Sequence, residues 1–468
     1  MPELCGRQTA FANAVRAELC HVDMPYSAHS EWGVATMNNP ENQLKRDIGL
    51  IAASLLVLNG LIGSGIFALP GKVAANAGLF SPWLFLIVGV LFLSVILVFA
   101  ELASYYKTTG GPVLYARAAF GPVAGFGTGW AIYLSRVTAF AANATFLAVY
   151  VAELVPSLGD PWTQKTITAL FTVGLTWANY IGVKDGVRTM GVFSVLKLLP
   201  LVLLVVLGLQ EVTATTLIPP APFTIEELGA TTLLLIYAYV GFETVAVTAG
   251  ETSKPQRTLP VALVGTMLVT GLLYFFIVLV FISVIPAGAY SESTLSDVGR
   301  ALAGPIGGTI IALTAIFSIA GNLAGSMISA PRLVFAMAEQ KTLPDVFAKV
   351  HPSYATPHIS ILLHGGLALL LGLTGSFELL AVASAVVRLL GYIICIASLP
   401  SIRRQRGDEP DSFRLPGGYL IPLLALGICI WLIAQSKLES WIVVGILLAL
   451  GGVLYAAETY YFSRKKTP

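Results

Sequence analysis

The sequence predicts an all-α integral membrane protein with about twelve membrane-spanning helices. Of its 468 residues, 56% are hydrophobic and only 11% are charged, and the mean hydropathy is +0.81. This composition is far more apolar than that of a water-soluble domain. The apolar residues are gathered in runs of the length that a spanning helix needs, roughly 20 residues. Because the bilayer core offers the backbone no hydrogen-bond partners, such runs must be helical.

Twelve apolar runs follow one another along the chain, separated by polar links. They cover residues 48–75, 81–105, 123–154, 166–182, 190–209, 228–249, 261–285, 306–337, 358–375, 378–400, 420–435 and 440–461. Hydropathy locates spans more reliably than it locates their ends. We therefore expect a multi-pass protein of the inner (plasma) membrane, with the lipid bilayer as its surroundings.

Basic residues alternate from link to link. The richer links carry Lys107 and Arg117, Lys184 and Arg188, Lys254 and Arg257, Lys341 and Lys349, and Arg403, Arg404 and Arg406. The intervening links carry only Lys165, Arg300 or Lys437. Cytoplasmic loops hold the excess of lysine and arginine in membrane proteins. We therefore expect both termini in the cytoplasm, with residues 1–46 as a cytoplasmic N-terminal tail.

The sequence has none of the common motifs of an enzyme or metal site. A His-Glu-x-x-His pair, a nucleophile elbow and a phosphate-binding glycine loop are all missing. The four cysteines have no metal-ligand spacing: they are Cys5, Cys20, Cys395 and Cys429. We expect no catalytic residue, metal, cofactor or nucleic-acid partner.

Two of the predicted spans are interrupted at similar depths. The first contains Gly60, Gly63, Ser64 and Gly65, and the sixth contains the segment 240–243 in its middle. Glycine destabilises a helix interior by about 1 kcal/mol relative to alanine, so glycines clustered at mid-membrane indicate a break. These glycines would alternatively permit close helix packing. The matching interruption in the sixth span favours a pair of broken helices, which points to a transport site at the membrane midplane.

The interrupted spans are the first and the sixth, so the second interruption comes five spans after the first. Residues 47–209 and 228–400 are therefore predicted to be two five-helix repeats. Residues 401–468 are left for two peripheral helices and a cytoplasmic C-terminal tail.

The two interrupted segments resemble motifs of the amino acid–polyamine–organocation transporter superfamily. The first span has Ile-Gly-Ser-Gly-Ile-Phe at 62–67, and the sixth has Gly-Phe-Glu at 241–243. The segment 108–115, the Phe120-Gly121 pair and the stretch from Arg332 through Leu343-Pro344 are also similar to superfamily patterns. The resemblance covers residues 47 to about 400. It implies the five-plus-five inverted-repeat fold of the leucine-transporter type and secondary transport of amino acids by alternating access. A membrane amino acid sensor or a channel with the same fold remains the alternative.

The resemblance also implies where the substrate binds. Its α-carboxylate would lie against backbone amides of the first break, and its ammonium would meet carbonyls at both breaks. This agrees with the partial charges at helix ends, which are positive at the N-terminus and negative at the C-terminus. The expected walls of the site are Ile62, Gly63, Ser64, Gly65 and Ile66 on one side and Ala238, Tyr239, Val240, Gly241 and Phe242 on the other.

Polar residues form stripes on three further spans. At helical spacing lie Tyr133, Arg136, Phe140 and Asn143 on the third, Ser318, Asn322, Ser326 and Ser329 on the eighth, and Ser384, Arg388 and Gly391 on the tenth. Serine and asparagine often only bond neighbouring membrane helices. Asn322 and Ser326, however, match substrate-pocket positions of related transporters. Together with Phe140, they are predicted to line a polar cavity.

Four charged residues lie well inside the spans: Arg136, Lys197, Glu243 and Arg388. Such residues are costly in a bilayer and are expected to face the protein interior. Glu243 would gate the pathway, relay protons or clamp two helices. One carboxylate cannot neutralise three cations, so the interior is predicted to carry excess positive charge. Arg388 would either read a carboxylate on the substrate side chain or serve as a structural strut.

Lys197 on the fifth span suggests how transport is coupled. Related transporters without sodium coupling often have a lysine at this position, beside the first break. An ammonium would offer a fixed positive charge and three donors to the carbonyls of the opened helix, in place of sodium. Because burial disfavours a charged lysine, alternating exposure would let it release and regain a proton. We expect sodium-independent transport, by proton symport or by antiport. The alternative is that Lys197 snorkels to the cytoplasmic interface.

Overall fold

The computed structural model is helical throughout the part of the chain that it describes. This part comprises residues 48–108, 110–182, 186–218, 225–406, 409 and 412–466. Within these ranges the chain forms no β-strand, and its single extended pairing is an isolated bridge between Ile48 and Thr252. The prediction of an all-α protein is confirmed. The predicted N-terminal tail, 1–46, lies outside the described residues, as does Lys184.

The helices follow the predicted apolar runs closely. In the first half they are α2 (Leu50–Leu61), α3 (Gly65–Ala77), α4 (Ser81–Ser104), α5 (Pro112–Phe120), α6 (Pro122–Leu154), α7 (Pro161–Ile181) and α8 (Gly186–Gly208). The rest are α9 (Ala214–Leu217), α10 (Ile225–Ile236), α11 (Thr244–Val247), α12 (Pro255–Val284), α13 (Leu295–Glu339), α14 (His358–Thr374), α15 (Phe377–Arg406), α16 (Leu420–Ala434) and α17 (Leu438–Lys466). The first run is divided into α2 and α3 and the sixth into α10 and α11, so both predicted interruptions are present.

Helix α13 starts well before its apolar run. Helix α13 begins at Leu295, and Thr294 caps it by accepting a hydrogen bond from the Ser296 amide. The chain leaves helical geometry at Ala303 and at Gly304, where φ is +66°. Pro305 follows directly, and a proline disfavours helical geometry in the residue before it. The kink therefore separates a short leading helix from the membrane segment, which the apolar run beginning at residue 306 had located.

Length and hydropathy alone identify fewer crossings than the sequence suggested. Six described segments are long and apolar enough to span a bilayer: Gly65–Ser104, Pro122–Leu154, Pro255–Val284, Leu295–Glu339, Phe377–Arg406 and Leu438–Tyr460. The first of these comprises both α3 and α4. Helices α2, α14 and α16 are apolar but shorter. The protein is thus a multi-pass helical membrane protein, and the number of twelve crossings remains a prediction.

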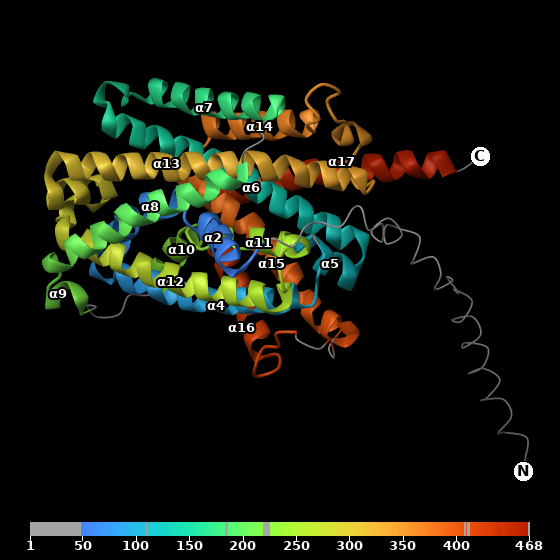
Figure 1. The fold of residues 1–468 in the computed structure, drawn as a ribbon, viewed down its shortest axis with the longest axis horizontal. Coiled ribbons are helices and arrows are strands. Elements are labelled where there is room, and N and C mark those ends of the chain that lie inside the picture. Colours follow the sequence, from blue (N-terminus) through green and yellow to red (C-terminus); the bar gives the residue numbers. More distant parts are fainter. Residues whose placement is uncertain are drawn as a thin grey trace, which may run out of the picture. The chain divides into compact units, whose positions relative to one another are not determined.

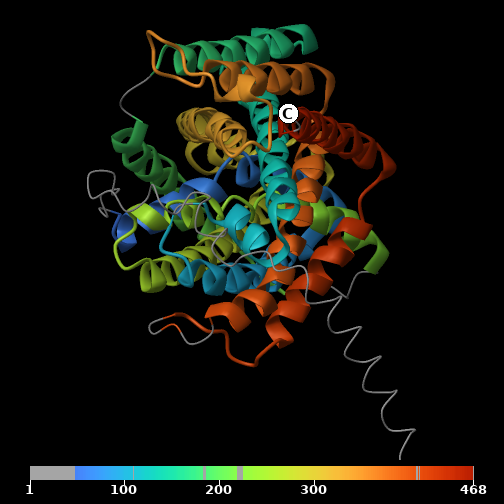
Figure 2. The ribbon, with the colours of Figure 1, turned by 90° about the vertical axis from the view of Figure 1, so that its right-hand side faces the viewer.

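Helices from the two halves of the chain pack in corresponding pairs. The second and seventh predicted spans, α4 and α12, lie side by side, as do the fourth and ninth, α7 and α14 (Figures 1 and 2). Helix α6 contacts both α13 and α15, and α13 contacts α8. A two-repeat arrangement would have these contacts, with the pair α6–α15 corresponding to the pair α13–α8, and the two repeats stay a prediction. Helices α2, α10 and α11 lie in the middle of this bundle (Figure 1).

Large apolar side chains cover the outward faces of several helices. On the part of α8 whose side chains are described, 196–208, the exposed residues are Leu196, Leu199, Val202, Leu203, Val206 and Leu207. On α7, Leu170, Val173 and Trp177 are also exposed. Water-soluble proteins rarely expose contiguous apolar surfaces of this kind, whereas lipid tails accommodate them. By contrast, the aromatic interior around Phe99, Phe242 and Tyr392 is closely packed, with ring centroids 4.9–5.4 Å apart.

Candidate functional site

The first break leaves helix-end carbonyls that other helices satisfy. Helix α2 ends at Leu61, and α3 starts at Gly65 after a non-helical Ile62. The last carbonyls of a helix have no partner within it. The Ile62 carbonyl accepts a hydrogen bond from Lys197 Nζ at 2.9 Å, and the Leu61 carbonyl accepts one from the Tyr274 hydroxyl at 3.1 Å. Helices α8 and α12 thus supply donors that hold the break open.

The second break is held by side chains close to it in the sequence. Helix α10 ends at Ile236 and α11 begins at Thr244. Between them Gly241 has φ = +111°, a conformation that favours glycine. The Gly241 amide donates to Glu243 Oε2 at 3.1 Å, and the Thr244 hydroxyl donates to the Gly241 carbonyl at 2.9 Å. Glu243 therefore caps the opened backbone as well as carrying a charge.

The two breaks touch each other through glycine. A Cβ atom on Gly60 would lie 2.5 Å from the Gly241 carbonyl oxygen, and one on Gly241 would lie 2.4 Å from the Gly60 oxygen. A Cβ atom on Gly65 would lie 2.9 Å from Ala238 Cα. Both interpretations of the glycine pattern therefore apply, because these residues interrupt the helices and also permit close backbone approach.

A cavity of about 170 Å³, lined in part by polar and charged side chains, lies where the two breaks meet. Of the residues predicted for the site, those that line it are Gly63, Ser64, Gly65, Phe140, Val240, Gly241, Asn322, Ser326, Arg388, Arg136, Lys197 and Glu243. They come from both interrupted helices and from α6, α8, α13 and α15. The cavity is smaller than the roughly 300–1,000 Å³ of pockets for drug-sized ligands, and so suits a small molecule.

Five other predicted site residues do not line the cavity with their side chains. Ile62 and Ile66 are fully buried in the surrounding core, and Ala238 packs behind Gly65. The Tyr239 hydroxyl donates to the Phe85 carbonyl at 2.8 Å, and the Phe242 ring packs 5.3 Å from that of Phe99. Their side chains belong to the helix packing, which leaves only their backbone groups available to the breaks.

A chain of amide hydrogen bonds crosses the cavity wall beside the first break. The Ser64 amide donates to Asn143 Oδ1 at 3.0 Å. Asn143 Nδ2 donates to Asn322 Oδ1, and Asn322 Nδ2 donates to the Asn59 carbonyl, both at 3.2 Å. The Tyr237 hydroxyl lies 3.2 Å from Ser64 Oγ. The network thus connects α2, the first break, α6, α13 and the second break.

Sequence reasoning missed two members of this network. Neither Asn59 nor Tyr237 belongs to the predicted site. Their positions, directly before Gly60 and directly before Ala238, were the available signal, since polar residues that flank a break can reach the opened backbone. Asn143 belongs to the predicted polar stripe of the third span but not to the predicted site.

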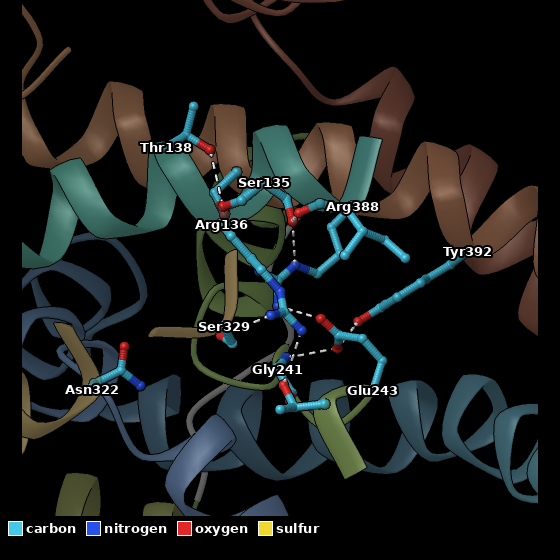
Figure 3. Close-up of polar contacts among 12 residues, drawn as sticks. Ser135, Arg136, Thr138, Gly241, Glu243, Asn322, Ser329, Arg388 and Tyr392 are labelled. Carbon is cyan, nitrogen blue, oxygen red and sulfur yellow. Dashed lines mark hydrogen bonds and ion pairs between the residues drawn. The ribbon is translucent and has the colours of Figure 1, made fainter. Parts of the chain in front are cut away.

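Glu243 and Arg388 form a buried ion pair. Their side chains are 1% and 5% exposed, and Glu243 Oε1 lies 3.0 Å from Arg388 NH1. The Tyr392 hydroxyl donates to Glu243 Oε2 at 2.7 Å, and Arg388 Nε donates to Ser135 Oγ at 3.1 Å. Arg388 and Arg136 reach toward Glu243 from different helices (Figure 3). Of the two roles considered for Arg388, this pairing favours the structural strut.

Arg136 and Lys197 bond to neutral groups. Arg136 NH1 donates to Ser329 Oγ at 2.9 Å, and its NH2 donates to Thr244 Oγ1 at 3.5 Å. Lys197 is only 3% exposed, and its ammonium is directed at the first break rather than at the cytoplasmic interface. This geometry disfavours the snorkelling alternative. The functional roles of both residues stay predictions.

A bundle of membrane helices in which two interrupted helices meet at a buried polar cavity defines a class of protein. It is the architecture of a secondary transporter, which binds its substrate near the membrane midplane and exposes the site to each side in turn. MhsT, solved in complex with L-phenylalanine, has a similar fold. The TM-score is 0.58 at 16% sequence identity, over 82% of this chain and 97% of that one.

The chain belongs to the amino acid permease family, whose profile matches residues 48–456. It is similar to the serine/threonine exchanger SteT of Bacillus subtilis, with 29% identity over 92% of this chain and 99% of SteT. The branched-chain amino acid permease BcaP of the same organism is 26% identical over 91% and 94% of the two chains. The human large neutral amino acids transporter small subunit 2 is 27% identical over 90% and 82%. The protein is therefore a membrane transporter of amino acids and not an enzyme.

Proposed function

We propose that this permease moves amino acids across the plasma membrane without sodium, by exchange or by proton symport, with the substrate held between the two helix breaks. The observation that carries this proposal is the 2.9 Å hydrogen bond from Lys197 Nζ to the Ile62 carbonyl. It puts a cationic side chain at the end of an opened helix, where carbonyl oxygens would otherwise attract a cation.

The substrate backbone fits the polarity of the breaks. The first amides of α3, at Gly65 and Ile66, have no carbonyl one turn earlier within their own helix, so they are suited to an α-carboxylate. Backbone carbonyls from Ala238 to Phe242 offer acceptors to an ammonium group. Five of the predicted residues thus contribute through the backbone, which explains how buried side chains and a substrate role are compatible.

The burial of Lys197 would change during the transport cycle. In the structure its ammonium is enclosed by protein and makes one hydrogen bond to the break. Separation of the break from α8 would remove that acceptor and admit water. The ammonium would then exchange its proton with one side of the membrane in one conformation and with the other side in the next.

We propose that residues 47–209 and 228–400 form the two repeats, with 401–468 at the periphery. We propose that both termini are cytoplasmic, which follows from the distribution of basic residues. The link that contains Lys254 and Arg257 would then face the cytoplasm, and Arg300 would face the outside.

Counterflow in proteoliposomes tests the coupling. Vesicles loaded with unlabelled amino acid would take up labelled amino acid equally well in sodium, potassium or choline. The second variable is an inward proton gradient, either present or absent. Lys197→Ala should lose transport or change its response to the gradient. Lys165→Ala is the matched control, since Lys165 lies over the Trp162 ring outside the cavity. Strict sodium dependence, or a Lys197→Ala protein that behaves as the parent, would remove the proposed role.

The same assay separates the transporter from its alternatives. A carrier exchanges labelled for unlabelled substrate, whereas a sensor binds without exchange and a channel shows no countertransport. A purified protein that binds amino acids but gives no counterflow in any cation would contradict transport.

A further inference from the structure

The cavity carries more positive than negative charge. Among the described residues, the ionisable side chains that line it are Arg136, Lys197, Arg388 and Glu243. Three cations face one carboxylate, and the sum remains positive even when Lys197 is counted as neutral. A zwitterionic amino acid with an uncharged side chain would leave this excess uncompensated. Excess charge within a helix bundle is costly, so the site favours a ligand of net negative charge.

Arg388 is not the source of the excess. Its NH1 lies 3.0 Å from Glu243 Oε1, and its Nε donates to Ser135 Oγ at 3.1 Å. Ser135 is itself tied to the same helix pair, because Ser384 Oγ donates to its carbonyl at 2.8 Å. The guanidinium is therefore neutralised and fixed between α6 and α15.

Arg136, in contrast to Arg388, is not neutralised by an ion pair within the described residues. No carboxylate of the described chain lies within ion-pair distance of it, and its two hydrogen-bond acceptors are the neutral hydroxyls of Ser329 and Thr244. A guanidinium has five N–H donors in a planar fork, so further donors remain for a ligand. Although it lies within the bundle, the residue is partly exposed, and it lines the cavity. Figure 3 shows its side chain extending from α6 toward Glu243 and Gly241.

The two hydroxyls orient Arg136 so that it can bind a second carboxylate. Ser329 and Thr244 each accept a hydrogen bond from the guanidinium, which fixes its orientation. Little further side-chain entropy would then be lost when a ligand binds. An arginine held in this way binds a carboxylate through two parallel hydrogen bonds. Gly65, at the first amides of α3, lines the same cavity as Arg136. A substrate α-carboxylate at Gly65 and a second carboxylate at Arg136 would thus share one cavity.

We infer that the substrate is an amino acid with an anionic side chain, such as glutamate or aspartate, and that Arg136 binds the side-chain carboxylate. Arg388 then acts as a positioning residue through Glu243. This inference rests on the proposed function and names the substrate class of the same site.

Binding of isosteric pairs tests the inference directly. Glutamate and glutamine, or aspartate and asparagine, differ in side-chain charge but hardly in size. For the purified parent protein, we expect at least one of the two acids to bind about tenfold or more tightly than its amide, as for one charged hydrogen bond. The readout is the dissociation constant from ligand titration, with unlabelled competitors against a labelled ligand.

Variants test whether Arg136 causes the preference for the acid over the amide. Arg136→Gln should bring the acid and amide constants together by weakening acid binding more than amide binding. Arg136→Lys should retain part of the preference, because it keeps the charge but not the fork. Arg300→Gln is the matched control, since Arg300 pairs with Asp297 at 2.6 Å away from the cavity. It should keep the parent ratio.

The outcomes separate the inference from the proposed function. A parent that binds both amides as tightly as the acids overturns the inference without the need for any variant. An unchanged ratio in Arg136→Gln also overturns it, as does loss of the ratio in Arg388→Gln but not in Arg136→Gln. In each of these cases exchange of neutral amino acids would leave the proposed function intact. A folded parent that binds and exchanges no amino acid would instead defeat the proposed function.

Discussion

At the residue scale, Glu243 connects the charge of the site to its backbone. One of its oxygens faces Arg388 and the other accepts from the Gly241 amide and the Tyr392 hydroxyl. The same side chain therefore neutralises a buried cation and holds the second break in shape. Removal of one partner from a buried ion pair leaves an uncompensated charge, which costs more than the pair contributes.

Glu243→Gln should destabilise the protein by about 3–5 kcal/mol, because Arg388 would lose its counter-charge while the side-chain shape is kept. The double variant Glu243→Gln, Arg388→Met should be less destabilised than the sum of the two single changes. Thermal unfolding of the purified proteins measures the order of their Tm values. Additive losses would mean that the two side chains do not act as a pair.

Gly65→Leu should abolish transport while the protein remains inserted in the membrane. Its first side-chain carbon would already lie 2.9 Å from Ala238 Cα, so the two breaks would be pushed apart. Gly63→Leu should act similarly by displacing Asn322, whose Nδ2 would lie 3.3 Å from the new Cβ. Gly174→Leu is the control, since nothing lies within 4 Å of that position on exposed α7. Uptake assays would contradict the proposed site if Gly65→Leu kept the parent's substrate affinity.

At the scale of elements, the first break is held by other helices, whereas the second is held by its own neighbours Glu243 and Thr244. Lys197 from α8, Tyr274 from α12 and Asn322 from α13 donate to carbonyls at the end of α2. The glycines make the breaks possible, and donors from neighbouring helices determine the geometry of the first break. Movement of α8, α12 or α13 would therefore change the hydrogen bonds at the first break directly.

Gly60→Ala tests the contact between the two broken helices. The added methyl group would lie 2.5 Å from the Gly241 carbonyl oxygen, which is backbone and cannot rotate away. We expect a lower Tm and slower transport. Gly271→Ala in α12 is the matched control, because this buried helical glycine has nothing within 4 Å. Its replacement should be neutral or stabilise the protein by up to about 1 kcal/mol. Equal Tm values for the two variants would show that the breaks do not depend on close approach.

At the scale of the whole molecule, a second buried ion pair joins distant parts of the chain. Arg403 on α15 binds Glu101 on α4 through two hydrogen bonds of 2.7 Å, and the Leu415 amide donates to the same carboxylate at 3.0 Å. The predicted second span, the tenth span and the link that follows it are thus connected. Arg403 belongs to the link predicted to be cytoplasmic, so this connection would lie on the cytoplasmic side.

The proposed orientation predicts which positions can be labelled from each side. In a background with all four native cysteines replaced, Lys254→Cys should react with a membrane-impermeant thiol reagent only from the cytoplasmic side. Arg300→Cys should react only from outside. Intact cells and inside-out vesicles provide the two measurements. Labelling of both positions from one side would contradict the predicted alternation of links.

The sequence alone determined the architecture and much of the composition of the site. Hydropathy identified the helical runs because a bilayer requires every spanning backbone to satisfy its own hydrogen bonds. The glycine clusters located both interruptions, since glycine weakens a helix wherever it occurs. The four intramembrane charges were found by their cost in lipid, and all four line the cavity. These conclusions needed only local composition.

The tertiary structure alone decided which charges are neutralised and where each side chain points. Lys197 and Ile62 are separated by 135 positions, and Ser135 and Arg388 by 253. Helical periodicity fixes the face of one helix but not its partner across the bundle. The pairing of Arg388 with Glu243, which leaves Arg136 to neutral hydroxyls, and the direction of Lys197 toward the first break therefore appear only when the helices are assembled. The physical reason is that a charge buried in the membrane is stabilised by contacts in space, and these contacts depend on packing between distant segments.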